Sequence, residues 1–232
     1  MTGRQERASA SDVHVWDWPL RIFHWLLVVS TAGAWATHYA GIEWFAWHRR
    51  CGYTTLVLVG FRVAWGFFGS RHARFSDFVR GPGSVMAYLR SAGRLPMAGH
   101  NPAGALAVLA FIAALLFQAS TGLFANDEIA NTGPFFGWVT QQTSNRLTHW
   151  HALNSKILLG LIAFHVLAVG WYDLVRRAGL LRAMFTGRKQ LPAEVEPIEG
   201  SHPLRALAIV LALAAALALA IRAAPEATVA LF

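Results

Sequence analysis

Five long apolar segments constrain the fold of this chain more than any other feature of its sequence. A helix needs about 20 mostly apolar residues to cross a bilayer core that is about 30 Å thick. Segments of this kind occupy, in chain order, residues 21–43, 50–69, 102–124, 147–172 and 205–222. The sequence therefore predicts an all-α integral membrane protein with five transmembrane helices.

The composition agrees with a membrane protein and excludes several other classes. The 232 residues are 55% apolar and 14% charged, whereas a soluble domain is about 25% charged. The formal net charge of +8 comes from Lys and Arg clusters between the apolar segments, so we expect contact with membrane lipid and none with nucleic acid. The single cysteine, Cys51, excludes an internal disulfide, a cysteine-based zinc site and a covalently attached c-type haem.

The distribution of basic residues predicts the orientation in the membrane. Fourteen Lys and Arg residues lie in the N-terminal arm up to and including Arg21, between the second and third segments, or between the fourth segment and Arg205 inclusive, and four lie on the opposite side. Because Lys and Arg concentrate in cytoplasmic loops, we expect a cytoplasmic N-terminus and an external C-terminus. The N-terminal arm is mostly polar and lacks a signal-peptide pattern, so we expect the first segment to be retained.

These features predict five regions along the chain. A four-helix domain is expected between a cytoplasmic arm and a cytoplasmic connector, and the fifth helix follows that connector as an addition to the four-helix core. In chain order, the expected regions are the cytoplasmic arm 1–19, the four-helix domain 20–175, the connector 176–203, the fifth transmembrane helix 204–222 and the external tail 223–232.

Two histidines in the fourth segment indicate a pair of cofactor sites. His151 and His165 are 14 residues apart, which is about 21 Å along a helix and within about 40° of a whole number of turns. Both rings therefore leave the same helix face at two depths, where ionisable side chains are usually functional. Neutral imidazole is a standard axial ligand of haem iron, so this spacing suits two stacked haems.

Matching the depths of histidines on antiparallel helices gives the second ligand of each haem. The first segment runs outward while the fourth runs inward, so His24 lies at the inner depth of His165. The second segment runs inward, so His48 lies at the outer depth of His151. His38 stays open as an alternative to His48, because it follows His24 by 14 residues and mirrors the spacing of the fourth segment.

Four further residues are candidates for contacts with the haems. Gly52 and Gly160 lack side chains near the ligand positions, which suits either the approach of a flat macrocycle or close helix packing. Arg62 and Lys156 are charges within apolar segments and are candidate partners of haem propionates. Arg62 has an alternative role, because a long basic side chain can snorkel to the membrane surface. The remaining histidines are expected to be structural, interfacial or solvated: His14, His72, His100, His149 and His202.

The motifs that carry these residues resemble those of the bacterial cytochrome b561 family, which also contains b-type membrane subunits of nickel–iron hydrogenases. The resemblance covers residues 15 to about 175. It implies a four-helix bundle with two non-covalent b haems, ligated by His24, His48, His151 and His165, in a bacterial inner membrane with the C-terminus in the periplasm. It thereby favours His48 over His38, while the fifth span departs from the shortest family members. The matching stretches are VWDWPLRIFHW (15–25), WHRRCGY and FRVAWGFFG (47–69), GHNPAGAL (99–106) and HWHALNSKILLGLIAFH (149–165).

The main functional hypothesis is electron transfer across the membrane. Two six-coordinate haems would connect the membrane quinone pool with a periplasmic redox partner, either a c-type cytochrome or a dehydrogenase such as a hydrogenase. A quinone site is expected by geometry near the inner haem, beside His24 and Arg62. Two functional alternatives stay open: a superoxide:quinone oxidoreductase, and a membrane anchor in which the haem is structural. The chain could also form a homo-oligomer, and this stays open as well. A transporter fits poorly, because the interiors of the segments lack acidic residues and show no inverted repeat.

Overall fold

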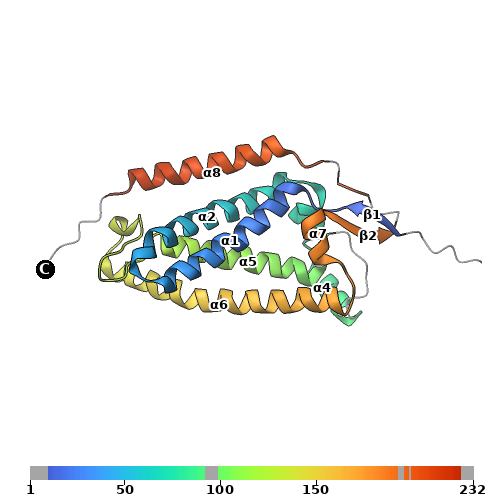
Figure 1. The fold of residues 1–232 in the computed structure, drawn as a ribbon, viewed down its shortest axis with the longest axis horizontal. Coiled ribbons are helices and arrows are strands. Elements are labelled where there is room, and N and C mark those ends of the chain that lie inside the picture. The colour runs from blue at the N-terminus through green and yellow to red at the C-terminus, as the bar shows by residue number, and fades with distance from the viewer. Residues whose placement is uncertain (1–9, 92–98, 193–195, 199, 226–232) are drawn as a thin grey trace, which may run out of the picture. The chain divides into compact units, whose positions relative to one another are not determined.

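The computed structural model describes residues 10–91, 99–192, 196–198 and 200–225. Residues 1–9 of the predicted arm (1–19) and most of the predicted tail (223–232) lie outside the described residues, and so do Arg4, Arg7 and Arg94 of the basic count. The described part is mostly helical (Figure 1). Its main elements are β1 (Ala10–His14), α1 (Trp18–Ala40), α2 (Phe45–Phe68), α3 (Phe75–Phe78), α4 (Pro82–Arg90), α5 (Pro102–Gly122), α6 (Gln141–Leu174), α7 (Leu180–Thr186), β2 (Arg188–Pro192) and α8 (Pro203–Ala223).

Within the described residues, four helical segments are long and apolar enough to cross a membrane. They are Ile42–Phe68, Pro102–Gly122, Gln141–Leu174 and Pro203–Ala223, and they correspond to the second to fifth predicted spans. The first predicted span forms the 23-residue helix α1 but is not among these four, because Trp, His, Thr and Ser side chains lower its mean hydropathy. That α1 crosses the membrane therefore stays a prediction.

The described residues of the chain form two compact units, and all five long helices, α1, α2, α5, α6 and α8, contribute residues to both. The first unit contains the described residues within Met1–Ile22, Trp65–Leu109 and Phe164–Pro203, and the second those within Phe23–Ala64, Ala110–Ala163 and Leu204–Phe232.

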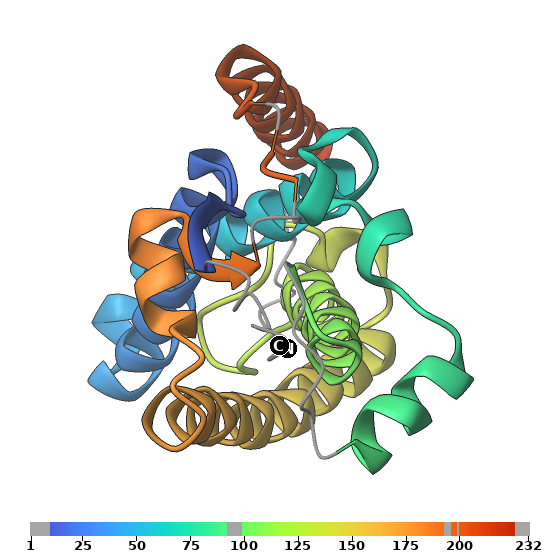
Figure 2. The same ribbon diagram turned by 90° about the vertical axis from the view of Figure 1, so that its right-hand side faces the viewer.

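The core of the second unit joins four helices. Val59 of α2, Leu115 of α5 and Leu158 of α6 are at most 5% exposed and pack together, and Leu27 and Trp35 of α1 pack against them. The fifth helix, α8, lies beside α2 (Figures 1 and 2), where an added Cβ at Gly60 would meet Leu213 at 3.3 Å. Residues of α1, α2, α5 and α6 thus share one apolar core in this unit, while the role of α8 as an addition to a four-helix core stays a prediction.

A short two-stranded sheet in the first unit corrects the prediction of an all-α chain. Strands β1 and β2 pair antiparallel from Ala10↔Pro192 to His14↔Arg188. Just before β2, Gly187 has a φ of 79°, and its carbonyl accepts the N–H groups of Val15 and Trp16 at 2.8 and 3.1 Å. The prediction missed this sheet because neither five-residue segment has the alternating pattern that marks a strand.

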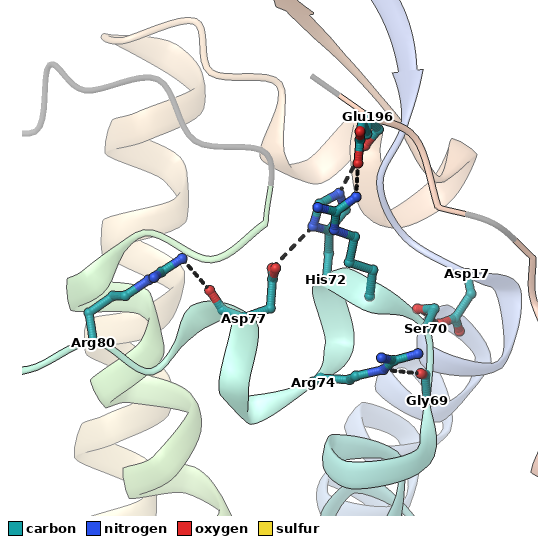
Figure 3. Close-up of polar contacts among 9 residues, drawn as sticks. Asp17, Gly69, Ser70, His72, Arg74, Asp77, Arg80 and Glu196 are labelled. Carbon is teal, nitrogen blue, oxygen red and sulfur yellow. Dashed lines mark hydrogen bonds and ion pairs between the residues drawn. The ribbon is translucent and has the colours of Figure 1, made fainter. Parts of the chain in front are cut away.

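The start of α1 depends on one buried carboxylate, Asp17, which is 0% exposed. Its Oδ1 accepts the N–H of Leu20 at 2.7 Å, as an N-cap residue does. Its Oδ2 accepts the Trp65 Nε1–H at 3.1 Å. The same oxygen accepts the hydroxyl of Ser70, and Asp17 and Ser70 lie side by side in Figure 3. These three donors compensate for burial of the carboxylate and tie the start of α1 to the end of α2.

We expect Asp17→Ala to lower the stability of the protein by about 2 kcal/mol or more. The substitution removes the cap and the buried acceptor to which Trp65 and Ser70 donate. Thermal unfolding of the purified protein measures the effect. Asp12→Ala is the matched control, because Asp12 forms an exposed ion pair with Arg188 at 3.6 Å and such pairs contribute little. Equal unfolding temperatures for the two variants would contradict this role of Asp17.

Candidate functional site

Two of the predicted ligands, His48 of α2 and His151 of α6, come together within the second unit. Their ring centroids are 6.2 Å apart, and the ring planes are inclined by 77°. These residues are 103 positions apart in the sequence, so the packing of the helices brings them together. The observation agrees with the pairing that the depth argument predicts.

Hydrogen bonds fix the orientation of both imidazole rings. His48 Nδ1 is 2.8 Å from the carbonyl oxygen of Ala34 in α1, and His151 Nδ1 is 2.9 Å from that of Gln118 in α5. Because a carbonyl oxygen only accepts, each Nδ1 carries the proton and donates. Each neutral ring then keeps the lone pair on Nε2, which is the arrangement that metal-ligating histidines usually adopt.

The separation of the two rings fits one iron ion between them. Bonds of about 2 Å from an iron to two imidazole nitrogens on opposite sides would put the ring centres about 6 Å apart. The observed 6.2 Å agrees with this value. The donor set of two neutral imidazoles is also that of a low-spin b-type haem, so the residues present fit such a group.

A glycine that the sequence analysis missed makes room for His151. An added Cβ at Gly122, the last residue of α5, would lie 2.9 Å from Cε1 of the His151 ring. Any side chain at this position would therefore displace the ring. The only sequence signal is the placement of Gly122 in a short polar stretch, SerThrGly, that ends a charge-free apolar segment.

A polar network between α5 and α6 also escaped the sequence analysis. Asn154, one turn after His151, is 7% exposed, and its Nδ2 donates to the Ala114 carbonyl at 2.9 Å and to Gln118 Oε1 at 2.7 Å. Gln118 thus binds His151 through its backbone and Asn154 through its side chain. These bonds fix the register of α5 against α6 and with it the position of the His151 ring.

The loop between α5 and α6 adds to this register. Ser144 of α6 is 0% exposed and donates to the Phe124 carbonyl at 2.6 Å, and the Asn126 N–H donates to Thr148 Oγ1 at 3.0 Å.

In the loop between α5 and α6, desolvation raises the pKa of Asp127. Hydrogen bonds from Asn131 and from the backbone of residues 129 and 130 outweigh that effect and lower this pKa to about 2.

The alternative ligand His38 also lies near His48, with ring centroids 5.8 Å apart and planes inclined by 50°. Proximity alone therefore does not decide whether His48 or His38 is the ligand. The surroundings differ, however, because the His38 side chain is exposed and, within the described residues, no carbonyl accepts a hydrogen bond from its ring. Of the two, His48 has the orientation expected of a ligand.

The other predicted pair, His24 and His165, is divided between the two units. His24 lies in α1 within the second unit, edge-to-face with Trp25 at 5.1 Å, and His165 lies in the part of α6 that belongs to the first unit. Both side chains are partly buried. Their pairing stays a prediction that rests on the depth argument.

The four additional candidates have different surroundings. Apart from the adjoining backbone of its own helix and its two chain neighbours, no described atom lies within 4 Å of an added Cβ at Gly52 or Gly160. Close packing against another helix therefore does not explain these glycines, and open space adjoins both. The snorkelling alternative for Arg62 is wrong, because its side chain is 3% exposed and does not reach the surface. Lys156 is exposed on α6.

Histidines predicted to be structural have such surroundings in the first unit. His72 is 6% exposed, and its ring nitrogens contact Asp77 Oδ2 at 3.1 Å and the Glu196 carbonyl at 3.4 Å (Figure 3). The His100 ring packs against the rings of Trp16 and Phe78, with centroids 4.7 and 4.6 Å away.

Comparison with known proteins gives a family and several relatives. A sequence model described as Prokaryotic cytochrome b561 matches residues 15–187. Proteins described as "Probable Ni/Fe-hydrogenase B-type cytochrome subunit" are 27% identical over 224 residues in Azotobacter chroococcum mcd 1 and 28% identical over 226 residues in Azotobacter vinelandii. Each alignment covers 80% of this chain and 91% of the relative. The protein of that description from Rhizobium leguminosarum bv. viciae is 25% identical over 222 residues, covering 80% and 92%. No solved structure matches this chain.

We expect Gly122→Ala to reduce the haem content of the purified protein, because the added Cβ would push the His151 ring away from its position. A pyridine haemochrome assay against protein concentration measures the change. Gly170→Ala, in α6, is the matched control, since an added Cβ there meets no described atom within 4 Å beyond its chain neighbours and the adjoining backbone of its own helix. Unchanged haem content in Gly122→Ala would contradict the placement of a haem at His151.

Proposed function

We propose that this chain, which belongs to the prokaryotic cytochrome b561 family, carries electrons across a bacterial inner membrane through two non-covalent b haems. Family membership and the similarity to b-type cytochrome subunits indicate a haem-containing membrane protein of electron transport. The observation that carries the finer proposal is the pair of His48 and His151. Their rings are separated by 6.2 Å, and each donates from Nδ1 to a backbone carbonyl.

The outer haem would be held by His48 and His151. When bound, the haem would supply one-electron redox chemistry, and the imidazoles of His48 and His151 would hold its iron. The carbonyls of Ala34 and Gln118 fix the ring orientations and increase the basicity of the ligands, which tunes the potential of the site. Gly122 provides the space in which the His151 ring takes this orientation.

The inner haem would be held by His24 and His165. The support is the 14-residue spacing between His151 and His165, which places the second ligand about 21 Å further along α6. Arg62 supports a site of this kind, because a cation that is 3% exposed within the protein is suited to pair with an anionic group such as a propionate. Lys156 stays a second candidate for a propionate contact.

The electrons would pass between membrane quinone and a redox partner at the periplasmic face. The curated relatives are described as hydrogenase subunits, which supports a dehydrogenase-type partner, and a c-type cytochrome is the other candidate. The quinone would bind near the inner haem, beside His24 and Arg62. The Lys and Arg distribution supports a cytoplasmic N-terminus and a periplasmic C-terminus.

Single substitutions of the ligands test the pairing. We expect His48→Ala and His151→Ala to lose the same haem, and His24→Ala and His165→Ala to lose the other, because each pair shares one iron. His38→Ala is the control and should keep both haems. Reduced-minus-oxidised spectra of the purified variants measure the outcome. Loss of a haem in His38→Ala with retention in His48→Ala would show that His38 is the ligand.

Reduction by quinol separates electron transfer from a purely structural haem. We expect a ubiquinol or menaquinol analogue to reduce both haems of the purified protein, measured from the absorbance of the reduced haems. Arg62→Gln should slow this reduction if quinone binds beside Arg62, while Lys156→Gln should not. Haems that stay oxidised with every quinol would favour the membrane-anchor alternative.

A further inference from the structure

A small cavity with basic side chains in its wall lies in the first unit, where the chain leaves α2. Its volume is about 170 Å³, and it is lined by Ser70, Arg71, Arg74, Gly200 and His202. A single water needs about 10–15 Å³ of such space, and a whole organic ligand occupies about 300–1,000 Å³. The cavity therefore suits a group of a few heavy atoms.

The donors around this cavity are incompletely used. Arg74 donates from Nε to the Gly69 carbonyl at 2.9 Å (Figure 3), while its two terminal nitrogens bond to no described residue. The His202 ring likewise has no hydrogen bond to any described residue. Its backbone φ is 42°, an uncommon value for a residue other than glycine.

Two carboxylates lie close to this cavity. Asp17 Oδ2 accepts the hydroxyl of Ser70, which lines the cavity, and Glu196, labelled in Figure 3, pairs with Arg71. The side chains of Glu196 and Arg71 are 72% and 49% exposed. Ion pairs between exposed groups are weak, so an anion bound in the cavity can compete with Glu196 for Arg71. Arg74 makes no such ion pair within the described residues and is the principal cation of the cavity.

The ends of two membrane-spanning candidates place the cavity near a membrane surface. Ser70 follows the segment Ile42–Phe68 by two residues, and His202 directly precedes the segment Pro203–Ala223. The rings of Phe67 and Phe68, at the end of α2, are 64% and 62% exposed. Basic side chains thus adjoin apolar side chains, as at a site for a lipid headgroup.

We infer that this cavity binds a phosphate group, with the guanidinium groups of Arg74 and Arg71 and the imidazole of His202 as donors. A phosphate has several acceptor oxygens that match the fork of an Arg side chain. The group could belong to an anionic phospholipid or to a free phosphate ion. The position at the end of two candidate spans favours the phospholipid, since anionic lipids are abundant in the cytoplasmic leaflet.

Native mass spectrometry of the delipidated full-length protein in detergent tests this site. We expect phosphatidylglycerol to bind more tightly than phosphatidylcholine. Arg74→Gln should weaken phosphatidylglycerol binding by about tenfold, as the loss of one charge-assisted hydrogen bond predicts. Arg74→Lys should restore part of the affinity by restoring the charge.

Arg80→Gln is the matched control, and it should bind phosphatidylglycerol as the wild type does. Arg80 is exposed on the same segment and donates to the Asp77 carbonyl at 2.8 Å (Figure 3), but it does not line the cavity. A separate arm adds inorganic phosphate alone. Phosphate binding that depends on Arg74, without preference for phosphatidylglycerol, assigns the site to the free ion. Equal binding by Arg74→Gln and Arg80→Gln in both arms would overturn the inference.

Discussion

Two hydrogen bonds from histidine rings to backbone carbonyls connect the four helices that contribute to the candidate site. The His48 ring, on α2, donates to the carbonyl of Ala34 in α1, and the His151 ring, on α6, donates to the carbonyl of Gln118 in α5. Each ring is thus carried by one helix and oriented by another. The distance between the two rings therefore depends on the packing of all four helices, and the apolar core around Val59, Leu115 and Leu158 maintains that packing.

The family gives this geometry a functional meaning. A membrane protein of electron transport has to hold its haems at fixed positions, because the ligands and their hydrogen bonds set the redox potential. The bonds from Asn154 to α5 keep α6 in register with its neighbour, and Gly122 leaves space for the ring of His151.

Much of the fold followed from the spacing of apolar residues, and much of the site from the spacing of histidines. The segments predicted as spans are helices, and the proximity of His48 and His151 agrees with the depth argument. Other features depend on contacts that no local pattern records. The role of Gly122 becomes visible only beside the His151 ring, and the pairing of β1 with β2 joins residues 174 positions or more apart. The prediction that Arg62 snorkels to the membrane surface was wrong, because the burial of its side chain depends on the neighbouring helices.

The number of b haems bound per chain tests the central claim most directly. Purified protein, assayed for haem after extraction with acidified organic solvent and for protein by amino-acid analysis, is predicted to hold two extractable haems per chain. One haem per chain, or a haem that stays attached to the protein during extraction, would contradict the account.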